Sequence, residues 1–281
     1  MTRREVLARA RELLTKKNVP DLDWEAELLL RDTLKISRTE LYAEPQLAVT
    51  PRQEAEFWAK IGRRLEGEPA AYIIGRREFY GLDFWVDDSV LIPRPETELL
   101  VEKALELART RQSPLIADIG TGSGAIAITL ALNLPEATVY ATDISQRALN
   151  TARCNCERHN ILGRVRIYAG DLLEPLPVPV DMIVANLPYI ATEDLPLVNT
   201  WGFEPKMALN GGQDGMDFIR RLCAQAGKLL KPGGSLLLEI GIGQKDKVVD
   251  LLCRLFPGAT IAVSPDLRRI DRVVCLSLPK E

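Results

Sequence analysis

The sequence is poor in histidine and aromatic residues, and its cysteines have no metal-binding spacing. Among 281 residues it has one histidine, five cysteines and 6% aromatic residues. An odd number of cysteines, none of them in CxxC pairs, argues against a disulfide framework and against a zinc site. We therefore expect reduced thiols, no bound metal and a cytoplasmic location.

The chain also lacks a basic excess and a long apolar run. Its formal net charge is −3, whereas proteins that bind nucleic acid usually carry a basic excess that neutralises phosphates. No apolar run approaches the roughly 18 residues needed to span a bilayer. The basic start leads directly into Glu5 and lacks the apolar core of a signal peptide. These absences predict no membrane partner and no direct contact with nucleic acid.

The first 75 residues have a helical pattern. Val6, Ala10 and Leu14 recur near a 3.6-residue period, and Thr50 followed by proline is typical of a helix start. We therefore predict a small all-α domain over residues 1–75.

Between residues 76 and 92 the helical pattern gives way to a pattern of strands and turns. The segment 79–86 is typical of two short strands around a turn at Gly81, with a second turn at Asp87 and Asp88. This pattern predicts a β-hairpin that links two domains.

From residue 93 to 281, predicted strands and helices alternate. The strands are expected at 115–119, 138–142, 165–169, 182–185, 235–239, 260–263 and 273–278. The helices are expected at 98–109, 125–133, 146–160, 216–230 and 244–255. Such β-α alternation predicts a Rossmann-like α/β domain, with a seven-stranded, mostly parallel sheet covered by helices on both faces. Ligands of these folds lie beyond the carboxyl ends of the strands.

A glycine-rich segment, Asp118 to Gly124, follows the first of these strands. Glycines permit a tight turn and let a ligand approach main-chain N–H groups. Gly120, Gly122 and Ala125 also satisfy the relaxed G-x-G-x-x-A dinucleotide pattern, and Asp143 follows about 20 residues later, where an acid accepts from a ribose. At this point a nicotinamide-dependent oxidoreductase remains an alternative.

Acidic side chains at the strand ends favour S-adenosylmethionine over a dinucleotide. The carboxylate of Asp118 suits a cationic amino-acid moiety and a sulfonium, whereas it would repel a pyrophosphate. After the third strand, Asp171 could accept from an adenine amino group while Leu172 packs on the ring. The expected cofactor-binding residues are Asp118, Gly120, Thr121, Gly122, Ser123, Gly124, Asp143, Asp171, Leu172 and Asn186.

The most specific feature is the segment Asn186-Leu187-Pro188-Tyr189, at the end of the fourth strand. An amide or aromatic amine nitrogen is a poor nucleophile, but two hydrogen-bond acceptors can grip its N–H groups and aim its lone pair. The Asn186 side-chain oxygen and the Leu187 carbonyl could supply them, and both contacts would strengthen as charge builds on nitrogen. Pro188 would stiffen the turn, and Tyr189 could stack on the planar acceptor. We expect Asn186, Pro188 and Tyr189 to be catalytic and all four residues to contact the substrate; an ordinary Asn-x-Pro turn is the alternative.

Together these motifs resemble those of the bacterial peptide-chain release factor glutamine methyltransferases. The resemblance covers nearly the whole chain and is carried by residues 92–98, 118–124, 186–189 and 204–209, with the helical N-terminal domain and the hairpin. It implies a class I S-adenosylmethionine-dependent methyltransferase domain, with S-adenosylhomocysteine as product. It also implies methylation of the glutamine in the Gly-Gly-Gln loop of class I release factors, which the N-terminal domain helps to bind. We expect a monomer.

Leu187 departs from the family, which usually has proline at this position. Asn-Leu-Pro-Tyr also resembles the ribosomal RNA adenine dimethylases, so an adenine-N6 methyltransferase acting on RNA or DNA stays open, as does a silent binding module. The contact at Leu187 is the main-chain carbonyl, which leucine retains. The chain has its own Gly-Gly-Gln at 211–213, and for Gln213 we expect a turn rather than a functional role.

Overall fold

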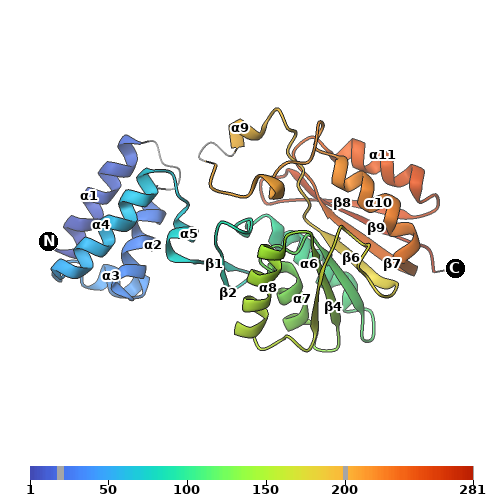
Figure 1. The fold of residues 1–281 in the computed structure, drawn as a ribbon, viewed down its shortest axis with the longest axis horizontal. Helices are drawn as coiled ribbons and strands as arrows, with labels where there is room; N and C mark the ends of the chain where they lie inside the picture. Colours follow the sequence, from blue (N-terminus) through green and yellow to red (C-terminus); the bar gives the residue numbers. More distant parts are fainter. Residues whose placement is uncertain (18–21, 199–201, 281) are drawn as a thin grey trace. The chain divides into compact units, whose positions relative to one another are not determined.

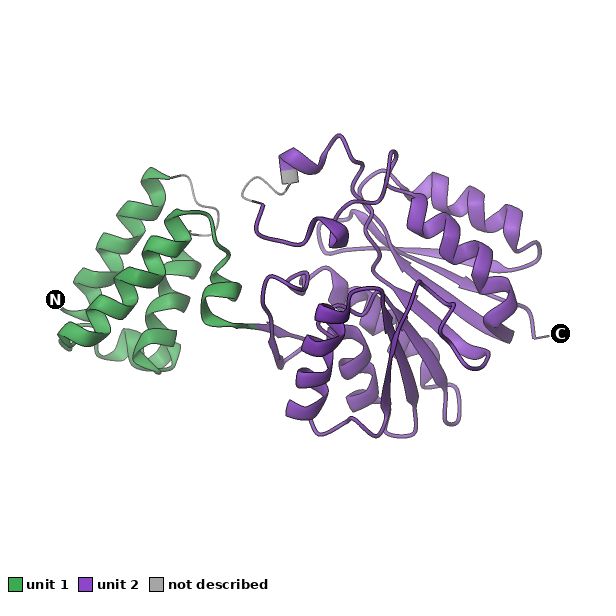
Figure 2. Ribbon diagram, in the orientation of Figure 1, with its two compact units in different colours: residues 1–76 green, residues 77–281 purple. Residues whose placement is uncertain are grey.

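The computed structural model describes residues 1–17, 22–198 and 202–280. The chain divides into two compact units, Met1–Arg76 and Arg77–Glu281 (Figure 2). The first unit has one hydrophobic core, and the second unit has two.

The first unit is helical, as predicted: its described residues form five helices, with one isolated β-bridge between Thr2 and Ala48, and the unit ends at the first residue of β1 (Arg76–Phe79) (Figure 1). The helices are α1 (Arg3–Lys16), α2 (Leu22–Leu34), α3 (Arg38–Ala43), α4 (Pro51–Leu65) and α5 (Ala70–Ile74). Thr2, Ser37 and Thr50 each begin a helix with a capping box, which satisfies backbone N–H groups that the first turn leaves unpaired. Apolar faces meet in a core that includes the fully buried Leu14 and Phe57.

The hairpin consists of β1 (Arg76–Phe79) and β2 (Leu82–Trp85). Tyr80 and Gly81 both have positive φ, as a tight two-residue hairpin turn requires. Phe79 and Phe84 are buried in a core of the second unit. The side chain of Asn155 also accepts a hydrogen bond from the Trp85 N–H (2.7 Å) and donates one to its carbonyl (3.0 Å). The hairpin therefore packs with the second unit, while its role as a linker stays a prediction.

The second unit is built on a seven-stranded sheet of order β5-β4-β3-β6-β7-β9-β8. Every neighbouring pair is parallel except those involving β9, which runs antiparallel to both β7 and β8. The strands are β3 (Leu115–Ile119), β4 (Thr138–Asp143), β5 (Val165–Ala169), β6 (Val180–Ala185), β7 (Leu230–Glu239), β8 (Thr260–Pro265) and β9 (Asp271–Ser277). The predicted seven-stranded, mostly parallel sheet is confirmed.

Helices cover both faces of this sheet (Figure 1). Successive strand residues point to opposite faces, so Ile116 and Val184 join one core while Ala117 and Ile183 join the other. The first core contains side chains of α6 (Thr97–Ala108), α7 (Ala125–Asn133) and α8 (Gln146–Arg158), and the second those of α10 (Asp217–Leu229) and α11 (Lys245–Leu255). Two short elements, α9 (Leu195–Val198) and the 3₁₀ helix η1 (Lys206–Ala208), lie between β6 and α10.

The order of the strands creates a switch point at one edge of the sheet. The chain order reverses between β3 and β6, and ligands of open α/β sheets bind beyond the carboxyl ends of the strands at such a point. Among the described residues, no helix is both long and apolar enough to cross a membrane. The same residues include no cluster of three or more His, Cys, Asp or Glu side chains placed to hold a metal.

Candidate active site

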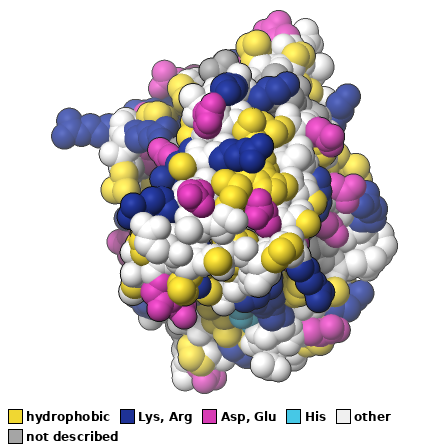
Figure 3. Space-filling view, turned by 90° about the vertical axis from the view of Figure 1, so that its left-hand side faces the viewer, with side chains coloured by type: hydrophobic (Ala, Val, Ile, Leu, Met, Phe, Trp, Pro, Cys, Tyr) yellow, Lys and Arg dark blue, Asp and Glu magenta, His cyan; other side chains and the backbone are white. Residues whose placement is uncertain are grey.

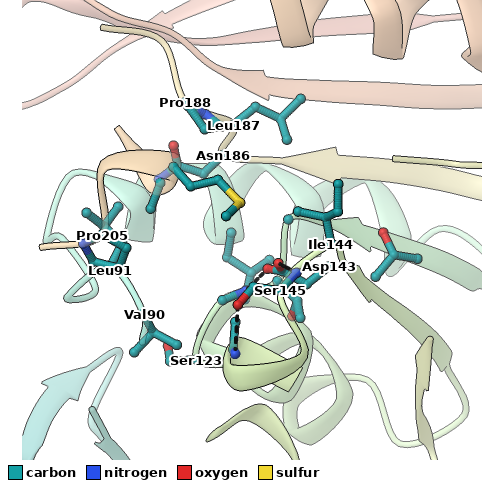
Figure 4. Close-up of a pocket in the computed structure, with 18 of the residues that line it drawn as sticks. Val90, Leu91, Ser123, Asp143, Ile144, Ser145, Asn186, Leu187, Pro188 and Pro205 are labelled. Carbon is teal, nitrogen blue, oxygen red and sulfur yellow. Dashed lines mark hydrogen bonds between the residues drawn. The ribbon is translucent and has the colours of Figure 1, made fainter. Parts of the chain in front are cut away.

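A cavity of about 440 Å³ lies at the carboxyl ends of β3, β4, β5 and β6. This volume is typical of a site for a small ligand. Ten of the residues predicted to form the site line the cavity: Gly120, Thr121, Gly122, Ser123, Asp143, Asp171, Leu172, Asn186, Leu187 and Pro188. Figure 4 shows Asp143, Ile144 and Ser145 across the cavity from Asn186 and Pro188, with Leu91 and Pro205 along another side.

The carboxylate of Asp118 lies beneath the glycine loop and does not line the cavity. Its Oδ2 accepts hydrogen bonds from the Thr121 hydroxyl (2.6 Å) and the Ala127 N–H (3.1 Å), so it connects the loop to the start of α7. Complete burial raises the pKa of Asp118 to about 7. The structure thus gives Asp118 a part in shaping the loop, and its direct contact with a cofactor stays a prediction.

The second carboxylate that bonds to the glycine loop is that of Asp143, the last residue of β4, and it faces the cavity. One of its oxygens accepts from the Gly122 N–H (2.9 Å) and the other from the Ser145 N–H (2.8 Å). Burial raises the pKa of Asp143, while these two backbone donors oppose the rise. Gly120, Gly122 and Gly124 all have positive φ, the backbone conformation for which glycine is favoured. Gly124 does not line the cavity.

At the end of β5, Asp171 forms an ion pair with Arg221 of α10. The sequence did not indicate this pairing, although Arg221 also lines the cavity. Leu172 is buried, and its carbonyl accepts from the Thr142 hydroxyl at 2.9 Å, which joins the ends of β4 and β5. Asp171 and Leu172 both line the cavity, and their contact with adenine stays a prediction.

On the opposite side of the cavity, the Asn186 side chain is hydrogen-bonded to a residue of α6. Its Nδ2 donates to the Thr97 Oγ1 at 3.0 Å, and the Thr97 side chain is buried. Leu187 is buried against the glycine loop, since a Cβ placed on Gly120 would lie 3.1 Å from its Cδ2. Thr97 also lines the cavity and is a site residue that the sequence did not indicate, although it lies inside the segment 92–98.

Tyr189 is not among the residues that line the cavity in the described part of the chain. Its ring lies beside Gly241, where an added Cβ would come within 3.0 Å of Cδ2. Burial raises the pKa of Tyr189 to about 12, so its phenol is neutral at physiological pH and is no general base. Stacking of Tyr189 on the acceptor stays a prediction.

Two chain segments that carry the family resemblance meet at the cavity. The Ile92 N–H donates to Glu204 at 3.3 Å, and the Arg94 guanidinium pairs with the same carboxylate at 2.5 Å. Arg94 and Pro205 both line the cavity. The segments 92–98 and 204–209 are therefore tied together by Glu204 at one side of the site.

The internal Gly-Gly-Gln tripeptide forms a turn beside the acceptor segment. The Gly211 N–H donates to the Ile190 carbonyl at 2.8 Å, and the Gly212 N–H donates to the Asn210 side chain at 3.0 Å. Gln213 is exposed. A Cβ on Gly211 would lie 2.7 Å from the Pro188 carbonyl oxygen, so this glycine permits a close backbone approach.

The strand order, the antiparallel β9 and the cavity at the switch point together define a class I methyltransferase fold. Solved structures show the same fold. A methyltransferase from Pyrococcus furiosus aligns with a TM-score of 0.54 at 21% identity, over 72% of this chain and 91% of that one. A ribosomal protein L11 methylase from Lactobacillus delbrueckii subsp. bulgaricus aligns with a TM-score of 0.51 at 22% identity, over 69% and 84%.

Sequence comparisons identify the family within this class. Residues 5–75 match the family model described as PrmC N-terminal domain, and residues 95–201 match the Methyltransferase small domain. The chain is 43% identical over 274 residues to the release factor glutamine methyltransferase of Moorella thermoacetica, covering 97% of both proteins. It is 42% identical over 277 residues to that of Geobacter sulfurreducens, covering 97% of this chain and 95% of the relative. The chain belongs to the release factor glutamine methyltransferase family, which confirms the resemblance and removes the oxidoreductase alternative.

Proposed function

We propose that this protein transfers the methyl group of S-adenosylmethionine to the side-chain amide nitrogen of the glutamine in the Gly-Gly-Gln motif of class I release factors. The observation that carries the proposal is the cavity itself. It has a cofactor-side carboxylate, Asp143, on one wall and the segment Asn186 to Pro188 on the other. Family membership supplies the substrate class.

The cofactor side fits S-adenosylmethionine in the chemistry of its donor set. We assign the ribose hydroxyls to the Asp143 carboxylate and the adenine to Asp171 and Leu172, with the backbone of the glycine loop along the methionine moiety. When bound, the cofactor's sulfonium supplies an activated methyl group next to the acceptor. Asp143 would fix the position of the cofactor, because hydrogen bonds to a charged acceptor are among the stronger ones.

On the acceptor side, Asn186 Oδ1 and the Leu187 carbonyl accept the two N–H groups of the glutamine amide and aim its lone pair at the methyl carbon. The amide nitrogen would take up the methyl group that the cofactor supplies, and it would then lose one proton to solvent. Developing positive charge on nitrogen strengthens both contacts, so they stabilise the transition state more than the bound substrate. Tyr189, being neutral, takes no proton.

We further propose that residues 1–75 bind the release factor, residues 76–92 link the domains and residues 93–281 carry out the transfer. The match of residues 5–75 to a dedicated family model supports a separate role for the helical unit. On the face drawn in Figure 3, Lys and Arg side chains are interspersed with Asp and Glu. This mixture, like the net charge of −3, favours a protein partner over a phosphate backbone.

Incubation with methyl-labelled S-adenosylmethionine tests the function. Unmodified release factor should become labelled, and a factor with alanine in place of the Gly-Gly-Gln glutamine should not. RNA and DNA in parallel reactions test the adenine alternative that Leu187 suggested. Label on nucleic acid, or none on the factor, would refute the proposal.

A further inference from the structure

The backbone that follows the acceptor segment, residues 186–189, is paired with the turn at residues 209–215. The Ile190 N–H donates to the Leu209 carbonyl at 3.1 Å, and the Gly211 N–H donates to the Ile190 carbonyl at 2.8 Å. The acceptor segment is therefore attached on its C-terminal side to a second stretch of chain.

A side chain from a third part of the chain holds the Tyr189 carbonyl. Gln244 immediately precedes α11 and is only 7% exposed. Its Nε2 donates to the Tyr189 carbonyl oxygen at 2.9 Å and to the Gly215 carbonyl oxygen at 3.1 Å. Its Oε1 accepts from the Gly241 N–H at 2.8 Å. One buried amide thus joins three backbone segments that lie far apart in the chain.

The three partners leave the Gln244 amide a single orientation. A backbone carbonyl only accepts and a backbone N–H only donates, so the NH₂ group must face the two carbonyls and the oxygen must face the N–H. Both NH₂ protons are used in these contacts. A carboxyl group at this position would keep the contact with Gly241 and could offer at most one donor to the two carbonyls.

Glycines let the turn approach the same part of the acceptor segment closely. A Cβ on Gly211 would lie 2.7 Å from the Pro188 carbonyl oxygen and 2.8 Å from the Tyr189 Cα. A Cβ on Gly215 would clash with the Tyr189 carbonyl oxygen. Backbone therefore packs directly on backbone here, and little room is left for the acceptor segment to shift.

We propose that Gln244 is a positioning residue that, with the turn at 211–215, fixes the backbone of the acceptor segment. The inference rests on the proposed function, in which the Leu187 carbonyl grips one N–H of the glutamine amide. Because that carbonyl belongs to the main chain, its direction depends on the peptide groups that follow it. Pro188 has a restricted φ, and Gln244 holds the carbonyl of Tyr189. The glycines of the internal Gly-Gly-Gln tripeptide thereby belong to the support of the acceptor site.

Two substitutions of Gln244 test this role. Gln244→Met removes all three contacts with a side chain of similar length, and Gln244→Glu retains the acceptor for the Gly241 N–H. With saturating cofactor and unmodified release factor, both should lower kcat by about ten- to hundred-fold, because a small displacement of a positioning group has an effect of this size. The dissociation constant for S-adenosylmethionine, measured by calorimetry, should stay unchanged in both, since Gln244 lies outside the cavity lining.

The glutamate variant separates positioning of the acceptor segment from a local role at the start of α11. If Gln244 served only to hold the Gly241 N–H, glutamate would replace it and kcat would be normal. A fall in kcat with unchanged cofactor affinity in Gln244→Glu therefore supports the inference, and a normal kcat overturns it.

Asn133→Asp is the matched control. It makes the same change from amide to carboxyl beside a backbone carbonyl, because Asn133 Nδ2 donates to the Thr129 carbonyl at 2.9 Å. Asn133 is the last residue of α7, at the end away from the glycine loop. The control should keep normal kcat and cofactor affinity. A loss of kcat as large as that of Gln244→Glu would assign the effect to the loss of an amide in general and would overturn the inference.

If neither Gln244 variant folds, Gly211→Ala decides, because its Cβ would press on the Pro188 carbonyl while Gln244 stays in place. A lower kcat with unchanged cofactor affinity supports the inference, and a normal kcat refutes it. Absence of transfer by the unsubstituted protein would instead refute the proposed function.

Discussion

Replacement of Asp143 by alanine should weaken the binding of S-adenosylmethionine by about ten- to hundred-fold. The Asp143 carboxylate lines the cavity, and each oxygen is bonded to one backbone N–H, that of Gly122 or Ser145. Each oxygen has lone pairs left over, which are the acceptors assigned to the ribose hydroxyls. The substitution therefore removes the direct contact and one support of the glycine loop.

The magnitude follows from the type of hydrogen bond. A bond to a charged group contributes about 1.5–3 kcal/mol, and each 1.36 kcal/mol corresponds to about a factor of ten. Asp143→Ala should lower the free energy of unfolding by less than the loss of two hydrogen bonds would suggest. Burial raises the pKa of Asp143, which shows that the fold disfavours its charge, and the alanine variant no longer bears this cost.

Calorimetric titration with S-adenosylmethionine and with S-adenosylhomocysteine measures the effect. The control is Asp250→Ala, which removes the same charge from the exposed surface of α11 and should leave both affinities unchanged. A dissociation constant for Asp143→Ala within about two-fold of the unsubstituted protein, less than 0.5 kcal/mol, would show that the ribose assignment is wrong.

Three further predictions concern the acceptor side, the internal tripeptide and pH. Asn186→Ala should lower kcat by about 10²–10³-fold, as loss of one transition-state hydrogen bond does. Its thermal midpoint should fall by only about 2–4 °C, because one hydrogen bond to Thr97 is lost; near-normal single-turnover rates would contradict its role. Gln213→Ala should transfer label to release factor at the normal rate, because Gln213 is exposed and the turn is held by Asn210 and the glycines. A slower rate would contradict this prediction. So would labelling of the unsubstituted protein itself that the variant lacks. Burial raises the pKa of Asp118 from 3.8 to about 7, so the folded state retains a proton that the unfolded state loses. The contribution of Asp118 to the free energy of unfolding should therefore fall, by on the order of a few kcal/mol, as pH rises from about 4 to 7. Urea denaturation of Asp118→Asn at pH 5 and pH 8 should show a smaller fall than the unsubstituted protein; equal falls would mean that Asp118 ionises freely.

The architecture of the second unit was predictable because β-α alternation leaves few ways to connect parallel strands. Less predictable was the start of β7, expected at residue 235 and found at Leu230. The intervening Lys231 to Gly234 has the composition of a turn, yet it continues the strand through a shift in its pairing with β6. Strand pairing with a neighbour, which local composition does not encode, decides this boundary.

The strand-end residues of the site were also predictable, because the carboxyl ends of parallel strands meet at one edge. Thr97 was not, since it belongs to a helix far from Asn186 in the chain and lies in no pattern that indicates a hydrogen bond to it. Tyr189 marks the opposite case. Its place next to Pro188 suggested a common site, but neighbouring residues in an irregular segment need not point the same way, and the ring lies beside Gly241.

The contact between Gly120 and Leu187 couples the two halves of the site, so that a substitution on one side affects what the other side can accept. An alanine at Gly120 would meet two separate obstacles, its φ of +71° and the Leu187 Cδ2 at 3.1 Å. Shortening Leu187 would remove the second obstacle and leave the first, so the cost of a substitution at one position depends on the residue at the other. The effect of a substitution at Gly120 therefore has to be measured together with the residue at position 187, and not one position at a time.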